Sequence, residues 1–241
     1  MKLVADLHVH SIASEHAYST IEEILTAAAD KGLEIVGIAD HGPTMPGGPH
    51  LYHFGNLRVL PEEWKGVRLL KGVEANIIDH EGNLDMPEIY LQKLDYALAG
   101  IHPFCYPGGT REENTRAMIR AMEHPLVDVI VHPGNPEYPI DPEEVLEAAM
   151  RLEKVIEINN SSLCGSRKGS ETNCALIAQL VAQMGAQIII GSDAHFSSDV
   201  GRFEEALAMC REAGVKEEQI INSSLERFWG YLERRRRLGD D

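Results

Sequence analysis

Short apolar runs rich in β-branched residues recur along the chain and alternate with stretches whose apolar positions have helical spacing. Such runs are typical of buried strands, and their alternation with amphipathic helices predicts parallel βαβ units. The even spacing of the runs favours a closed α/β barrel. Strands are expected at residues 3–7, 34–39, 68–73, 95–99, 127–131, 155–158 and 187–190, with a weaker eighth at 219–221.

Several of the predicted helices have a recognisable start, in which an N-cap residue is followed three positions later by glutamate. A chain of 241 residues is long enough for one large core, and no linker interrupts the alternation. We therefore expect a single domain over residues 1–241. The predicted starts are Ser19 with Glu22, Thr110 with Glu113, Asp141 with Glu144, and Ser223 with Glu226.

Residues able to bind metal fall at the carboxyl ends of the predicted strands, in the segments DLHVH, IADHG, GVEAN, GIHP, VHPGN and GSDAH. In a parallel barrel all these ends open on one rim, so residues far apart in sequence converge there. This shared placement predicts a metal centre at the rim. Its candidate ligands are His8, His10, His16, His41, Glu74, His102, His132, Asp193 and His195.

The size of this ligand set indicates more than one ion. A single hydrolytic zinc takes about three protein ligands and a water, so nine candidates suit two or three ions. Imidazole ligands with a minority of carboxylates favour zinc, with manganese or iron as alternatives.

A basic pair follows the sixth predicted strand, in EINNSSLCGSRKGSE. The planar guanidinium of Arg167 suits bidentate binding of phosphate, and Lys168 is a second candidate, although an ordinary solvated loop explains the pair too. His50 and His53 lie in a long Gly- and Pro-rich loop. Contact with substrate and plain solvation are both open for these two histidines.

The formal net charge of −16 bears on the partners of the protein. Long nucleic acids and anionic membranes bind to basic surfaces, so neither is expected as a partner. The basic run at 234–237 is interpreted as the solvated end of a helix, where positive charge suits the dipole. The first residues lack the apolar core of a signal peptide, and a cytoplasmic location is expected.

Eight segments together resemble the PHP (polymerase and histidinol phosphatase) domain, most closely its YcdX-type phosphatase branch. They are DLHVH, SEHAYS, IADHG, GVEAN, GIHP, VHPGNP, EINNSS and GSDAH, and the resemblance extends from residue 3 to about residue 229. It implies a distorted (β/α)7 barrel with three zinc ions. Carried over by motif, one ion would be held by His8, His10, Glu74 and Asp193, a second by Glu74, His102 and His132, and a third by His16, His41 and His195.

The resemblance, the ligand set and the basic pair suggest hydrolysis of a small phosphorylated metabolite, a phosphomonoester, by a hydroxide held by the metal ions. The family leaves the substrate open, because some members are histidinol phosphatases. A phosphodiesterase or nuclease would need a basic or aromatic groove, and a non-catalytic metal-binding module would have lost ligands. Neither the substrate nor the formation of a homo-oligomer is decided by the sequence.

Overall fold

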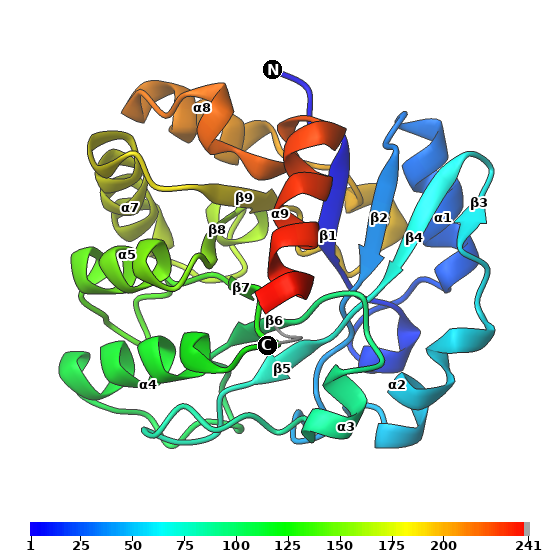
Figure 1. Cartoon of the computed structure of the whole chain (residues 1–241), viewed down its shortest axis with the longest axis horizontal. Coiled ribbons are helices and arrows are strands. Elements are labelled where there is room, and N and C mark those ends of the chain that lie inside the picture. The colour runs from blue at the N-terminus through cyan, green and yellow to red at the C-terminus, as the bar shows by residue number, and fades with distance from the viewer. Residues whose placement is uncertain (239–241) are drawn as a thin grey trace.

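A core of parallel strands is surrounded by helices in the computed structural model, which describes residues 1–238 and side chains as far as Arg234 (Figure 1). The strands are β1 (Ala5–Val9), β2 (Ile35–Ile38), β3 (Glu63–Trp64), β4 (Val67–Lys71), β5 (Glu74–Asn76), β6 (Leu98–Gly100), β7 (Val129–Ile130), β8 (Val155–Asn159) and β9 (Ile188–Gly191). The α-helices are α1 (Ile21–Asp30), α2 (Leu51–Asn56), α3 (Glu88–Leu91), α4 (Arg111–Glu123), α5 (Pro142–Arg151), α6 (Asn160–Leu163), α7 (Ser170–Met184), α8 (Glu204–Ala213) and α9 (Leu225–Leu238).

The strands form two sheets, with the orders β3-β4-β2-β1 and β5-β6-β7-β8-β9. All pairings are parallel except the short hairpin of β3 with β4. The sheets meet through isolated bridges, Val9 with Ala194 and His41 with Glu74, instead of continuous ladders. The α/β barrel-like fold is thus confirmed, and its distortion lies at these two junctions.

The strand predicted at 68–73 corresponds to β4, which ends at Lys71, and after a break a further strand that was not predicted, β5, begins at Glu74. The ring of Tyr96 lies at this break, with its hydroxyl donating to the Leu7 carbonyl at 2.7 Å. A Cβ at Gly37 or Gly72 would come within 2.3 or 2.4 Å of Tyr96 side-chain atoms. Glycine at position 37 on β2 and at position 72, just after β4, therefore leaves room for this ring in the barrel.

Other boundaries also differ from the predictions. The first strand both begins and ends two residues later than predicted, at Ala5–Val9, and the later end puts His8 on the strand itself. The weak eighth strand is wrong: residues 217–223 form two 3-10 turns, and Ile220 makes one isolated bridge to Ile188.

Two of the four predicted helix starts are confirmed, at Thr110 and at Asp141. The start predicted at Ser19 is wrong by one residue: Thr20 caps α1 in a capping box with Glu23. Ser223 is also displaced by one, since Arg227 donates its backbone N–H to the Ser224 hydroxyl. Adjacent hydroxyl residues offer the same capping oxygen, and only the path of the chain selects between them.

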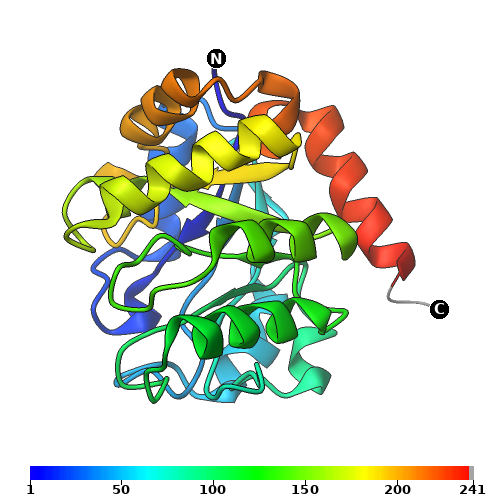
Figure 2. The same ribbon diagram turned by 90° about the vertical axis from the view of Figure 1, so that its left-hand side faces the viewer.

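The helices α4, α5 and α7 lie side by side on one flank of the barrel (Figure 2). Their buried apolar faces, with the outward side of the strands, make the largest part of the core.

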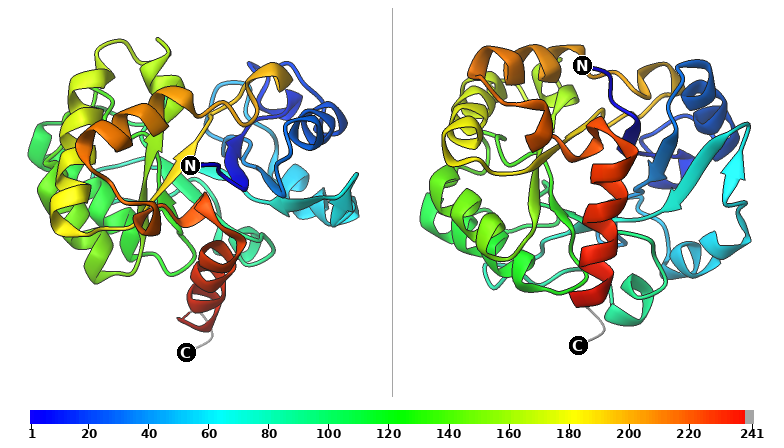
Figure 3. Two further views of the ribbon diagram at one scale, coloured as in Figure 1. Left: turned by 90° about the horizontal axis from the view of Figure 1, so that it is seen from above. Right: turned by 45° about the horizontal axis from the view of Figure 1, so that its top comes forward.

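Inside the barrel, the aliphatic side chains near the beginnings of the strands pack against α9. Phe228 is fully buried there, and the Tyr231 hydroxyl donates to the Asp128 carbonyl at 2.6 Å. Helix α9 therefore covers the amino-terminal ends of the strands (Figure 3).

No helix in the described part of the chain is long and apolar enough to cross a membrane. The basic run at 234–237 belongs to the last turns of α9. Arg234 is exposed, and the other three side chains of the run are outside the described residues.

Candidate metal centre and active site

The nine predicted ligands gather at the carboxyl end of the barrel. His8 lies on β1, Glu74 is the first residue of β5, and the others follow β1, β2, β6, β7 and β9 within a few residues. Seven of the nine are at most 4% exposed. His195 keeps 31% of its side chain exposed, and His16 is also exposed.

Glu74 is the centre of this cluster. Its Oε1 lies 2.7 Å from His132 Nε2 and 2.9 Å from His102 Nε2. Its Oε2 lies 2.8 Å from His41 Nδ1 and 3.4 Å from His10 Nε2. One carboxylate thus faces imidazoles from loops on several sides of the barrel.

Asp193 is the second carboxylate of the cluster. Its Oδ1 lies 3.4 Å from His10 Nε2, 3.5 Å from His195 Nδ1 and 3.6 Å from His8 Nε2. It has a positive φ of 55°, a strained conformation for aspartate. Strain of this kind persists where the surroundings fix the side chain for a task.

Several atoms of the cluster are buried and have no hydrogen-bond partner, although a buried polar atom without one is costly. Two further pairs of imidazole nitrogens face each other: His102 Nε2 with His132 Nε2 at 3.1 Å, and His16 Nε2 with His41 Nε2 at 3.2 Å. Each pair can share one proton in an N–H···N hydrogen bond or face a cation, and together with the unpartnered atoms the donor set fits metal ions. The buried atoms of the cluster that have no hydrogen bond of suitable geometry are His8 Nε2, His10 Nε2, His41 Nδ1, Glu74 Oε2, His102 Nδ1 and Asp193 Oδ1.

Among the described residues, four groups of three donors have their ligand atoms within 4.8 Å of one another. They agree with the motif-based grouping in joining His8 to His10 and in sharing Glu74 between groups. They differ in placing His41 with Glu74 and His102, and in placing His132 with His8. His16 belongs to none of the groups, and its ring stacks on those of His41 and His195, with centroids 4.9 and 5.0 Å apart. The groups are His8, His10 and Asp193; His8, Glu74 and His132; His41, Glu74 and His102; and His10, His41 and His195.

The charge states suit metal binding, which requires ionised carboxylates and neutral imidazoles. Burial would raise the pKa of Glu74, but His102 and neighbouring imidazoles hold it well below its ordinary value. Burial and the nearby His41 lower the pKa of His10 to about 3. Burial also lowers the pKa of His102.

His8 differs from these imidazoles. Burial would lower its pKa, but the charge of Glu157 raises it well above the ordinary value. Glu157 Oε1 lies 2.8 Å from His8 Nδ1, and Oε2 accepts the backbone N–H of His132 at 3.0 Å. The sequence analysis did not identify Glu157, and the available signal was a charged residue inside the otherwise apolar run VIEI.

Asp40 orients the histidines on the other side. Its carboxylate is fully buried and accepts hydrogen bonds from the hydroxyls of Ser11 and Ser14, each at 2.8 Å. Ser14 Oγ in turn lies 3.2 Å from His10 Nδ1 and from the backbone N–H of His41. Partners of this kind fix the orientation of imidazole ligands.

A cavity of about 760 Å³ opens over the cluster, and its lining includes His41, His102, Asp193 and both residues of the predicted basic pair, Arg167 and Lys168. Arg167 Nη1 donates to Asp193 Oδ2 at 2.8 Å, and 16% of its side chain is exposed. Lys168 is exposed.

His50 and His53 are not part of this cavity lining. The exposed His50 caps α2, accepting the backbone N–H of Tyr52 on its Nδ1 at 3.1 Å. His53 Nε2 lies 3.1 Å from Asp40 Oδ2, so it contacts the shell of the cluster from behind.

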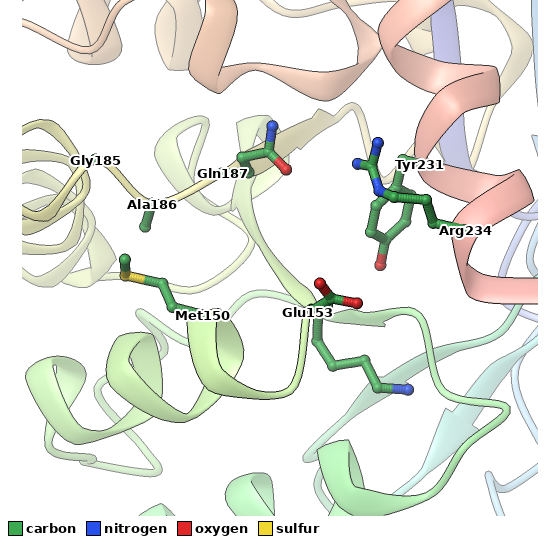
Figure 4. Close-up of a pocket in the computed structure, with 8 residues that line it drawn as sticks. Met150, Glu153, Gly185, Ala186, Gln187, Tyr231 and Arg234 are labelled. Carbon is green, nitrogen blue, oxygen red and sulfur yellow. The ribbon is translucent and has the colours of Figure 1, made fainter. Parts of the chain in front are cut away.

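A smaller cavity of about 230 Å³ lies at the opposite end of the barrel, between α9 and the turns that precede β8 and β9 (Figure 4). It is lined by Glu153, Lys154, Tyr231 and Arg234 among others, and by none of the candidate ligands. The Lys154 ammonium is occupied by the carbonyls of His124, Pro125 and Val127. Of these two cavities, the larger one combines space with candidate ligands.

Comparisons with known proteins concern the whole chain and its fold. The family model described as "PHP domain" matches residues 6–233. A protein of Thermoanaerobacter sp. (strain X514) named "probable phosphatase" is 54% identical over 243 residues, covering 100% of this chain and 99% of its own. A second "probable phosphatase", from Acetivibrio thermocellus, is 50% identical over 236 residues and covers 98% of each chain.

Among solved structures, the chain resembles a histidinol phosphate phosphatase from Lactococcus lactis, solved with zinc, L-histidinol and phosphate. The TM-score is 0.61 at 16% identity, and the match covers 90% of this chain and 95% of that one. At this identity the likeness concerns the fold.

Proposed function

Because the chain belongs to the PHP domain family, we propose that it is a metal-dependent phosphatase that hydrolyses small phosphomonoesters. The observation that carries the proposal is the cluster of buried, mutually facing donor atoms beneath a cavity with a guanidinium on its wall. The names of the relatives from Thermoanaerobacter and Acetivibrio support the same reaction class.

We infer that the centre holds three zinc ions, with manganese or iron as alternatives. When bound, such ions lower the pKa of water and neutralise charge on phosphoryl oxygens. The zinc in the Lactococcus structure supports the choice of metal. The proposed ligands are His8, His10, His16, His41, Glu74, His102, His132, Asp193 and His195.

The other polar residues have distinct tasks in this proposal. Arg167 approaches the ligand cluster from the cavity side, where its planar donors suit a phosphate, and Lys168 adds positive charge at the same wall. Glu157 and Asp40 hold His8 and His10 in place from behind. His53 acts through Asp40, and His50 remains a weaker candidate for contact with an extended substrate.

A monoester is favoured over a nucleic acid strand. The chain carries a net charge of −16, and the cavity wall includes the carboxylates of Glu137 and Asp199. These charges repel the phosphates of a nucleic acid strand that extends beyond the cavity, whereas a small ester lies entirely within it. Histidinol phosphate is a candidate substrate through the likeness to the Lactococcus enzyme, whose fold is shared.

The test compares substrates and metal states of the purified protein. We expect a nitrophenyl monoester to be hydrolysed in preference to its diester and to a single-stranded oligonucleotide. A chelator should abolish the activity, and added zinc or manganese should restore it, with metal content measured by mass spectrometry. Preferential cleavage of the diester or the oligonucleotide would replace the phosphatase with a phosphodiesterase. Full activity without metal would reject the metal centre.

A further inference from the structure

An exposed phenylalanine on the cavity wall is not explained by the proposed phosphate chemistry. Phe104 lines the cavity, yet 87% of its surface is exposed. Its φ is 68°, in the left-handed region that a bulky side chain rarely adopts. An exposed ring in a strained conformation contributes little to the core, so its placement needs another reason.

The turn that carries Phe104 is anchored on both sides. His102, two residues earlier, is a buried member of the ligand cluster. Tyr106, two residues later, is 6% exposed, and its ring contacts that of Tyr138 at 5.9 Å between centroids. The backbone N–H groups of Cys105 and Tyr106 both donate to the His102 carbonyl. The phenyl ring is therefore presented from a fixed base.

The cavity has two chemically different sides. Arg167 and Lys168 follow β8. The loops after β2, β6 and β7 contribute apolar groups. Around the barrel, β5 lies between β2 and β6, and β7 follows β6, so the three loops belong to one side of the rim. The apolar lining residues are Met45, Pro46, Ile101, Pro103, Phe104 and Pro136.

The size of the cavity points to a substrate with a substantial organic part. Cavities of 300–1,000 Å³ are typical of sites for whole small molecules, and this one has about 760 Å³. A phosphoryl group held beside Arg167 would leave most of that space to the alcohol part of the ester. The carboxylates of Glu137 and Asp199 on the wall disfavour further negative charge there.

We propose that Phe104 determines specificity by stacking on a ring of the leaving group, so that the enzyme prefers phosphomonoesters of alcohols that carry an aromatic or heteroaromatic ring and no negative charge. This inference rests on the proposed phosphatase function. Aromatic rings pair favourably in stacked or edge-to-face arrangements, beyond the area that they bury. Pro46, Pro103 and Pro136 add further apolar surface to the same cavity lining.

The test uses esters whose leaving alcohols have similar intrinsic reactivity: benzyl, cyclohexylmethyl and ethyl phosphate. The zinc-loaded wild type should have its highest kcat/KM with benzyl phosphate. Phe104→Ala should lower that value about two- to tenfold, corresponding to the measured worth of an aromatic pair, and leave ethyl phosphate unchanged. Phe104→Leu should reduce the preference for benzyl over cyclohexylmethyl phosphate, because it keeps apolar volume without the ring.

Two controls separate this role from a structural one. Tyr52→Ala removes another exposed aromatic, 72% exposed and outside the cavity lining, and should change none of the three values. Phe104→Gly should melt at the same or a higher temperature than the wild type, since glycine adopts positive φ without strain.

An equal loss on all three esters, or no loss on benzyl phosphate, would overturn the role of Phe104 while the phosphatase function stands. Failure of the wild type to hydrolyse any monoester would reject the proposed function, and this inference with it.

Discussion

The two ends of the barrel are built on opposite principles. At the amino-terminal end, α9 fills the opening with Phe228 and Leu232, and polar groups such as the Tyr231 hydroxyl have partners. At the carboxyl end, imidazoles and carboxylates are buried with atoms that have none, and Asp193 and Phe104 are strained. The amino-terminal end stabilises the fold, whereas the carboxyl end holds the candidate ligands in arrangements that lower stability.

The largest expected effect comes from removing the shared carboxylate. Glu74→Gln should lower the bound metal and reduce phosphatase activity by roughly a thousandfold or more, because several kcal/mol of transition-state stabilisation depend on the ions. Mass spectrometry should show that the variant has lost metal ions, and circular dichroism should show that it is still folded. Full metal content in this variant would show that Glu74 is not a ligand.

A substitution at the amino-terminal end should lower stability and leave metal content and activity unchanged. Phe228→Ala removes a fully buried ring and should lower the free energy of unfolding by about 3–5 kcal/mol. Activity and metal content, measured well below the melting temperature, should stay near wild type. The matched control is Phe104→Ala, whose exposed ring should alter stability by about 0.5 kcal/mol or less. Loss of metal in Phe228→Ala would show that the two ends are coupled.

Glu157 tests whether the strand below the rim belongs to the site. Glu157→Gln keeps the shape of the side chain but removes the charge beside His8, and should weaken metal affinity about 10- to 100-fold. The affinity is measured by competition with a chelator at equilibrium. The control is Glu153→Gln, an exposed residue just before the same strand, which should leave affinity unchanged. Equal effects of the two changes would contradict a specific role for Glu157.

The smallest effect is expected at the cavity wall. Arg167→Ala should raise KM for a phosphate ester by about tenfold or somewhat more, as expected for loss of a charge-assisted hydrogen bond. Metal content should be unchanged, and Arg167→Lys should recover part of the loss. An unaltered KM would remove Arg167 as the phosphate anchor.

Much of the rim could be predicted because its signals are local. A strand of β-branched residues followed directly by histidine or acid is visible in one short segment, and the barrel brings such segments together. What depends on distant partners could not be predicted. The ring of Tyr96 lies against Gly72 at the break between β4 and β5, and the contact of Glu157 with His8 joins residues 149 positions apart. The position of α9 was also hidden, since an amphipathic helix fits any apolar opening.

The ligand cluster lies across the seam between the two sheets, so ions bound there would also hold the sheets together. Each of the four groups of donors takes at least one residue from the sheet of β1 and β2, or the loops after it, and at least one from the sheet of β5 to β9. An ion held by any group would link the two sheets across a seam where backbone pairing is limited to isolated bridges. The free energy of metal binding would then stabilise the two sheets against separation at the seam. Amide hydrogens at the seam, such as those of His10 and Gly42, are where that stabilisation would be read by hydrogen exchange.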